Sequence, residues 1–155
     1  MSVKTKMIEF KIKLMSERHL EEVARLEKIC FSVPWSKTSL KEEINNENAS
    51  FLVAVDKNEK VFGYTGFTFV LDEGYITNIA VFPQYRGNGV AKKLLEALVK
   101  FAQDKKLKFI SLEVRKSNVS AVSLYQKLNF LSAGVRKNFY SYPKEDAIIM
   151  TRYLN

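Results

Sequence analysis

Residues 78–91 read NIAVFPQYRGNGVA and combine the pattern of a strand with that of a helix. The first half of this stretch is apolar and typical of a strand, while apolar residues recur at helical spacing from Val90 onward. Gly87 and Gly89 lie between the two and permit backbone angles and close approaches that side chains block. Unpaired amides in the first helical turn and the positive end of the helix dipole favour an anion there, and Arg86 adds a charge. The stretch therefore predicts a phosphate-binding turn between a strand and a helix.

The same pattern also arises as a plain turn, so its surroundings have to decide. It lacks the Lys-Ser/Thr ending of a P-loop. It also follows a run of strands, instead of opening a βαβ unit with an acidic residue about 20 positions further on, which argues against dinucleotide binding.

The residues up to and including the start of this stretch predict four strands and two helices. Apolar residues alternate from Ile8 to Leu14, as in a half-buried strand. Ser16 and Ser36 are candidate caps of a first and a second helix. Three β-prone runs, FLVAV, VFGYTGFTFV and YITNIAVF, follow with links of hairpin length between them and predict an antiparallel meander.

The residues after it predict two helices and three strands. A helix is expected from Val90 to about Asp104, then the strand KFISLEV, then a helix from Asn118 through Leu128. Two last strands are expected near 131–136 and 147–153. The order β-α-α-β-β-β-α-β-α-β-β predicts an α/β fold with a mixed, mostly antiparallel sheet of about seven strands and four helices on its two faces. We expect one domain over residues 1–155, with a flexible start at 1–6.

Composition limits the classes of function. Lys and Arg number 25 against 17 Asp and Glu, a net charge of +8 that favours anionic partners or serves solubility alone. No run of five or more basic residues forms a nucleic-acid patch, so no direct nucleic-acid recognition is predicted. The apolar runs are too short for a bilayer and no signal peptide is recognisable, so we expect a cytoplasmic protein.

The single cysteine and the single histidine provide too few soft donors for a zinc site, and no metal is expected. Cys30 ends an amphipathic helix pattern and His19 lies near its start. Both are interpreted as structural residues.

Arg86, Gly89 and Ala91 form an R-x-x-G-x-A pattern that resembles the Q/R-x-x-G-x-G/A signature of the GNAT superfamily of N-acetyltransferases, and the resemblance extends over nearly the whole chain. It implies acetyl-CoA as co-substrate. The pyrophosphate would lie on the amides of residues 87–92 and the pantetheine would pair like an added strand along residues 79–81. The donor-binding residues implied are Ile79, Ala80, Val81, Arg86, Gly87, Asn88, Gly89, Val90, Ala91, Lys92 and Asn118.

Four further blocks resemble the RimI type of protein N-terminal acetyltransferase: FSVPWS from Phe31, NIAV from Asn78, LEVRKSNVSAVSLYQKLNF from Leu112 and EDAIIM from Glu145. This resemblance implies transfer to the N-terminal alanine of a small-subunit ribosomal protein. Acetylation of a lysine or of a small-molecule amine stays open, because the fold accommodates many acceptors. A non-catalytic acetyl-CoA-binding module is a third possibility. The oligomeric state cannot be read from these residues.

Amide formation from a thioester needs a neutral amine, a polarised carbonyl and a proton for the departing thiolate. In KFISLEVR, the apolar residues share one face and Glu113 projects from the other. The resemblance makes Glu113 the general base, acting directly or through water, and Tyr125 the general acid. It also assigns polarisation of the carbonyl to backbone near Ala80, splayed by a bulge, and implies direct attack in a ternary complex. Without the resemblance, Glu113 reads as a surface carboxylate and Tyr125 as a core aromatic.

Aromatic residues are candidates for a rim around the acceptor, although scattered aromatics more often serve packing. The rim candidates are Trp35, Phe139, Tyr140 and Tyr142, and Asn78 is a further candidate acceptor contact. Two positions depart from the RimI pattern. Asn129 replaces a usual glycine after a helix, which suits a left-handed cap. NFYSYP, residues 138–143, replaces NYYP and is expected as a loop at the acceptor entrance.

Overall fold

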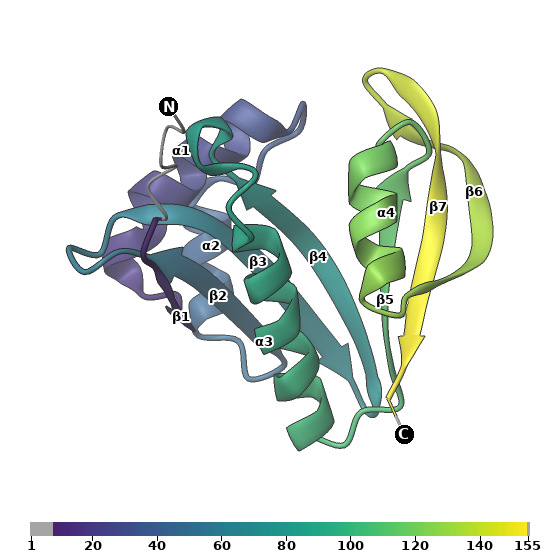
Figure 1. Ribbon diagram of the computed structural model, residues 1–155, viewed down its shortest axis with the longest axis horizontal. Coiled ribbons are helices and arrows are strands. Elements are labelled where there is room, and N and C mark those ends of the chain that lie inside the picture. The colour runs from purple at the N-terminus through teal and green to yellow at the C-terminus, as the bar shows by residue number, and fades with distance from the viewer. Residues whose placement is uncertain (1–7, 155) are drawn as a thin grey trace, which may run out of the picture.

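A computed structural model describes residues 8–154, and its element order agrees with the order predicted from the sequence (Figure 1). The elements are β1 (Lys11–Leu14), α1 (Leu20–Cys30), α2 (Lys37–Ile44), β2 (Ala49–Val55), β3 (Val61–Val70), β4 (Glu73–Val81), α3 (Val90–Asp104), β5 (Phe109–Arg115), α4 (Val119–Lys127), β6 (Leu131–Ser141) and β7 (Lys144–Tyr153). The flexible start expected at 1–6 lies outside the described residues. No helix within 8–154 is long and apolar enough to cross a membrane.

Within these residues the strands form one seven-stranded sheet in the order β1-β2-β3-β4-β5-β7-β6. Every neighbouring pair is antiparallel except β4 and β5, which confirms the expected mixed, mostly antiparallel sheet. The parallel pair is short: only residues 73–75 of β4 pair with residues 109–111 of β5. Beyond these residues the two strands diverge, as Figure 1 shows. The sheet is therefore open between β4 and β5 on the side toward which β4 ends.

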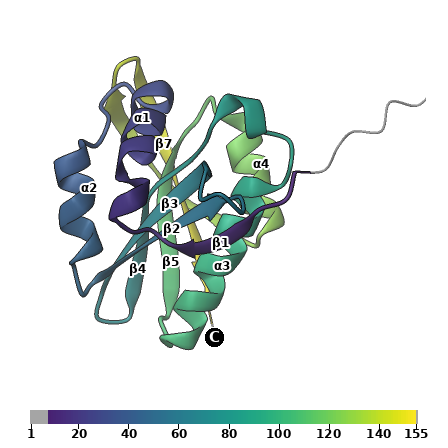
Figure 2. The same cartoon turned by 90° about the vertical axis from the view of Figure 1, so that its left-hand side faces the viewer.

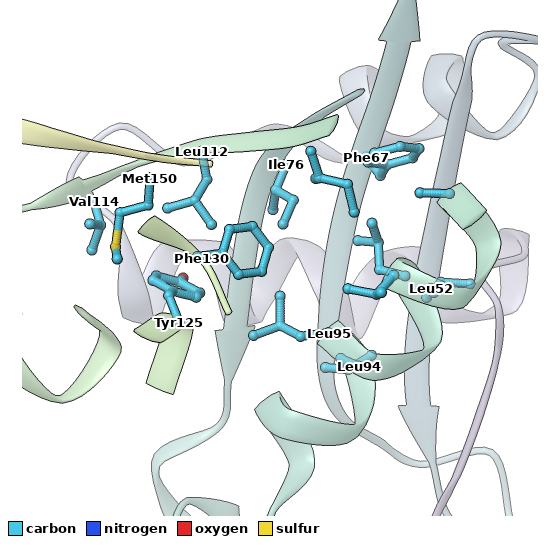
Figure 3. Close-up of a cluster of buried hydrophobic side chains, with 14 of the residues drawn as sticks. Leu52, Phe67, Ile76, Leu94, Leu95, Leu112, Val114, Tyr125, Phe130 and Met150 are labelled. Carbon is cyan, nitrogen blue, oxygen red and sulfur yellow. The ribbon is translucent and has the colours of Figure 1, made fainter. Parts of the chain in front are cut away.

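Helices cover both faces of the sheet, α1 and α2 on one and α3 and α4 on the other (Figure 2). Leu94 and Leu95 of α3 and Phe130 after α4 pack with strand residues in one core (Figure 3). Leu26 of α1 and Leu40 of α2 lie in a second core on the opposite face. Because both faces are covered, β2 and β3 are nearly continuous runs of buried apolar residues rather than alternating ones.

A β-bulge lies in β4, near Ala80, where the resemblance implied one. Asn78 pairs with Gly66 and Ile76 pairs with Phe67, which leaves Thr77 as the extra residue. A Cβ at Gly66 would lie only 2.5 Å from the Thr77 hydroxyl oxygen, so glycine is needed opposite the bulge. The bulge precedes Ala80 by three residues and follows directly on the last residues of β4 that pair with β5. A bulged strand bends, which fits the divergence of β4 from β5 at this point.

The two C-terminal strands are longer than predicted, and the prediction of a loop at 138–143 was wrong. Tyr140 pairs with Glu145 and Ser141 with Lys144, so most of that segment belongs to the β6–β7 hairpin. The register shifts between Arg136 and Tyr140, and Asn138 there has a positive φ of 54°. This irregularity interrupts the period-two pattern by which a strand is recognised in a sequence.

Other local predictions are confirmed, with one adjustment. The Asn118 side-chain oxygen accepts a hydrogen bond from the backbone N–H of Ala121 at 3.2 Å and caps α4. Asn129 has a φ of 68°, the left-handed conformation expected after that helix. Ser16 precedes a short 3-10 turn, Glu17–His19, and α1 begins only after it.

Candidate active site

Two cavities occupy the opening between β4 and β5 and meet inside the sheet. The first, of about 500 Å³, is lined from the side of α3 and α4. The second, of about 660 Å³, is lined by the segment between α1 and α2, by β5 and by the tip of the β6–β7 hairpin. The residues that line both are Cys30, Phe31, Ile79, Asn118 and Tyr125. The site is thus continuous, with Tyr125 at the junction.

The loop between β4 and α3 forms one end of the first cavity. Gly87 and Gly89 both have a φ of 79°, and a Cβ at either would meet nothing within 4 Å. The backbone conformation, and not a lack of space, therefore requires glycine at these positions. Gly89 is the N-cap of α3, so the unpaired amides of the first turn lie at the cavity. Together with the helix dipole, these amides provide an anion site.

Arg86 both supports this loop and lines the first cavity. Its Nε donates to the Val81 carbonyl oxygen at 3.1 Å, and its Nη2 lies 3.4 Å from the Cys30 sulfur. Burial raises the pKa of the Cys30 thiol, and the Arg86 charge opposes this only in part. We therefore assign Cys30 to the wall of the cavity as a thiol, in line with its interpretation as a structural residue.

Ten of the eleven expected donor-binding residues line the first cavity; Asn88 does not. Its side-chain amide donates to the carbonyl oxygens of Tyr85 and Arg86, at 3.0 and 3.1 Å. The side chain of Asn88 therefore stabilises the loop, so the donor binding expected of Asn88 falls to its backbone.

The edge of β4 that faces the opening presents backbone groups at alternate residues. Phe82 N–H donates to the Phe62 carbonyl at 2.9 Å, so antiparallel alternation directs the backbone groups of Ala80 toward β3. The groups of Ile79 and Val81 then face the opening. Val81 already accepts from Arg86 through its carbonyl. The N–H groups available for polarising a carbonyl are therefore those of Ile79 and Val81, one residue to either side of Ala80.

Glu113 lies on β5 and lines the second cavity. Leu112 and Val114 beside it are buried, whereas the Glu113 side chain is 33% exposed, as the alternation of the strand predicted. One carboxylate oxygen lies 3.2 Å from the Nε of Arg136 on β6. The carboxylate is therefore accessible from the cavity and from solvent, and a charged neighbour already orients it.

Tyr125 lies on α4, with its ring buried against Phe130 at a centroid distance of 5.9 Å (Figure 3). Its hydroxyl has no hydrogen-bond partner within residues 8–154. Burial raises the pKa of this phenol well above its ordinary value, so it stays protonated at neutral pH. The Tyr125 hydroxyl is thus a protonated donor at the junction of the two cavities.

The four aromatic residues expected as a rim, Trp35, Phe139, Tyr140 and Tyr142, all line the second cavity. Arg115, which the sequence reading did not single out, holds this part of the hairpin in place. Its guanidinium donates to the carbonyl oxygens of Tyr142 and Pro143, each at 2.9 Å, and lies 4.2 Å from the centre of the Tyr140 ring. This part of the wall is therefore held together by contacts of Arg115.

A buried carboxylate, Glu27 of α1, lies behind the second cavity and was also missed. It is fully buried and contacts Trp35, Tyr64 and Asn78. A signal was present in the sequence, because Glu27 follows Leu20 and Val23 at the spacing of the apolar stripe of α1. An acidic residue in an apolar stripe indicates a buried polar network, although its partners lie too far away in the chain to be found from the pattern.

The chain matches the model of the acetyltransferase (GNAT) family over residues 20–130. It is 34% identical to the ribosomal protein bS18-alanine N-acetyltransferase of Haemophilus ducreyi, covering 92% of this chain and 99% of that one. It is 37% identical to the protein of the same name from Haemophilus influenzae, covering 86% and 92%. The crystal structure of the ribosomal-protein-S18-alanine N-acetyltransferase from Escherichia coli superposes with a TM-score of 0.86 at 29% identity, covering 95% of each chain.

Proposed function

The chain belongs to the acetyltransferase (GNAT) family, and on that premise we propose that it transfers the acetyl group of acetyl-CoA to the N-terminal α-amine of a protein. The acceptor we propose is a ribosomal protein that begins with alanine, because that is the substrate named for the relatives above. The observation that carries the proposal is the pair of cavities that meet at Tyr125, one with an anion site and one with an exposed carboxylate. Such a reaction belongs in the cytoplasm, where ribosomal proteins are made.

The residues of the first cavity fit acetyl-CoA. The amides of residues 87–92 and the charge of Arg86 suit a pyrophosphate. The backbone groups of Ile79 and the N–H of Val81 face the opening and can pair with the amides of a pantetheine arm, in the way that peptides add to open strand edges. Asn118 lines the same cavity at the start of α4. When bound, acetyl-CoA supplies the activated acetyl group.

The residues of the second cavity suit an amine acceptor. Glu113 takes a proton from the amine, directly or through one water. An α-amine has a pKa near 8, so about a tenth of it is neutral at pH 7, whereas a lysine near 10.4 needs over about 3 kcal/mol more. An α-amine therefore demands less of the base than lysine does, which favours protein N-termini as substrates.

The remaining groups act on the thioester. An N–H of Ile79 or Val81 stabilises charge on the carbonyl oxygen, and Tyr125 donates its proton to the departing sulfur. No side-chain nucleophile is needed, since the amine attacks directly while both substrates are bound. The basic charge of +8 suits a negatively charged ribosomal neighbourhood.

A peptide library that varies in its first residues, incubated with the protein and acetyl-CoA, tests this function by mass spectrometry. We expect acetylation of free N-termini that begin with alanine, and the same peptides with a blocked α-amine serve as the control. Acetylation of internal lysines alone would refute the proposed acceptor. A rise in melting temperature with acetyl-CoA but no acetylation of any amine would show a binding module instead.

A further inference from the structure

We propose that Glu27 is a positioning residue that fixes the side-chain amide of Asn78, so that the Asn78 oxygen faces the second cavity and accepts a hydrogen bond from an N–H of the acceptor's first residue. This inference rests on the proposed function for the identity of the acceptor. Its evidence is the hydrogen-bond network around Glu27, which joins α1, the segment before α2, β3 and β4.

The network around Glu27 consists of three donors. Trp35 N–H donates to Oε1 at 2.9 Å, and the Tyr64 hydroxyl donates to Oε2 at 2.7 Å. The Nδ2 of Asn78 lies 3.0 Å from Oε1 and 3.1 Å from Oε2. Burial raises the pKa of Glu27, and the three donors oppose that shift. Hydrogen bonds donated to both oxygens favour the ionised form, so we take Glu27 to be a carboxylate.

These contacts determine which end of the Asn78 amide faces the cavity. A carboxylate oxygen can only accept, so the group beside Glu27 must be the NH₂ end of the amide. The third contact of Nδ2, 3.3 Å from the Tyr64 hydroxyl oxygen, agrees, because that hydroxyl has given its own proton to Glu27. The Asn78 oxygen is therefore directed away from Glu27.

That oxygen is available to a ligand. Within residues 8–154 it has no hydrogen-bond partner, and it is not among the buried polar atoms that lack one. Asn78 is half-buried and lines the second cavity, so this is where the oxygen is exposed. A carbonyl oxygen at that position attracts the N–H groups of an amine, whereas a reversed amide would present its own hydrogens and repel them.

Trp35 connects the same carboxylate to the opposite wall. Its backbone N–H is held by Glu27 while its ring contacts Phe51 at a centroid distance of 5.8 Å, and Trp35 also lines the second cavity. One buried carboxylate thus places two of the expected acceptor contacts, Trp35 and Asn78, although it does not line the cavity itself.

Steady-state kinetics of Glu27→Gln, Asn78→Ala and the double variant test the proposal, with an alanine-starting peptide as acceptor. In Glu27→Gln the new amide needs an acceptor, so the Asn78 amide rotates and loses its outward oxygen. We expect each single variant to raise the acceptor KM about 10-fold, the effect of one hydrogen bond. kcat and the acetyl-CoA KM should stay within about two-fold, because the lost contact serves acceptor binding alone.

The double variant separates positioning from general damage. If Glu27 acts through Asn78, the double variant should raise the acceptor KM about 10-fold. Two independent effects would instead multiply to a rise of about 100-fold. The matched control is Glu21→Gln on the same helix, an exposed glutamate whose one ion pair among residues 8–154 is with Lys37 at 3.3 Å, and it should change nothing. A multiplicative double variant, an unchanged KM in Asn78→Ala, or an equal rise in the acetyl-CoA KM would overturn the proposal.

A measurement on the wild-type protein covers the case in which Glu27→Gln does not fold. The side-chain NH₂ signals of Asn78, identified by their loss in Asn78→Ala, should exchange slowly with solvent and stay in place when peptide is added. Fast exchange would show that the NH₂ faces the cavity and would refute the inference. If the wild type acetylates no N-terminal peptide, the proposed function fails, and the exchange measurement still tests the arrangement of Glu27 and Asn78.

Discussion

Replacing Tyr125 with phenylalanine should slow catalysis strongly and leave stability almost unchanged. The ring would keep its contact with Phe130 at 5.9 Å, and the hydroxyl has no partner to lose within residues 8–154. A general acid contributes at least about 100-fold to a rate, which equals about 2.7 kcal/mol of barrier. We therefore expect kcat to fall by at least about 100-fold while the free energy of unfolding changes by less than about 0.5 kcal/mol.

Tyr64→Phe is the matched control, because it removes a hydroxyl that makes a buried hydrogen bond and has no proposed role in catalysis. The Tyr64 hydroxyl donates to buried Glu27 at 2.7 Å, a bond to a charged group worth about 1.5–3 kcal/mol. For a chain of this length the loss corresponds to a fall in melting temperature of about 3–12 °C. Its kcat should stay within about three-fold of wild type, since Asn78 keeps two contacts to Glu27.

The assay is release of free thiol with saturating acetyl-CoA and an alanine-starting peptide, run from pH 6 to 9 beside thermal melts of both variants. Burial raises the pKa of Tyr125, so the phenol stays protonated over this range and should produce no basic limb in the rate profile. A Tyr125→Phe variant whose kcat lies within about three-fold of wild type would refute the general-acid role.

Three further substitutions test separate parts of the structure. Glu113→Gln should lower kcat about 100-fold, yet destabilise the protein by less than about 1 kcal/mol because its ion pair with Arg136 is exposed; turnover at the wild-type rate in the thiol assay would remove Glu113 from the mechanism. The pKa of Glu145 is lowered in the folded state, mainly by the hydrogen bond from the Ser117 hydroxyl. The stability that Glu145 contributes is therefore complete above its unfolded pKa of 4.5 and is lost as the pH falls through the folded pKa. The free energy of unfolding of Glu145→Gln should therefore fall less steeply in acid than that of the wild type. Urea unfolding measured from pH 7 to 3 would contradict this if both proteins lost stability equally with falling pH. Asn129→Ala should destabilise by about 1 kcal/mol, whereas Asn129→Gly should not, and equal urea midpoints for the two would disprove the left-handed cap.

The parts of the fold set by neighbouring residues could be predicted from the sequence. The bounds of α3, Val90–Asp104, follow from its apolar stripe, and the start of α4 follows from the capping side chain of Asn118. Both signals act within a turn or two of the chain, where spacing alone determines which groups meet. The turn expected to bind phosphate is local in the same sense, because the angles at Gly87 and Gly89 and the unpaired amides belong to one short segment.

The parts that depend on distant residues could not be predicted. Glu27 meets Tyr64 and Asn78, which lie 37 and 51 positions further along the chain, and no periodicity connects them. The length of the β6–β7 hairpin was hidden by the positive φ of Asn138, which is stabilised by a hydrogen bond from its N–H to Asp146. The opening between β4 and β5 depends on where a strand pair stops, a property of the whole sheet.

That opening also determines how two molecules reach one reaction centre. The first cavity is reached past α3 and α4, and the second past the α1–α2 segment and the hairpin on the other side of the sheet, with Tyr125 where they meet. On the proposed function, the coenzyme and the acceptor therefore approach the reaction centre from different sides of the sheet. An acceptor placed as proposed would enter the second cavity with its first residue, whatever the length of the chain that follows.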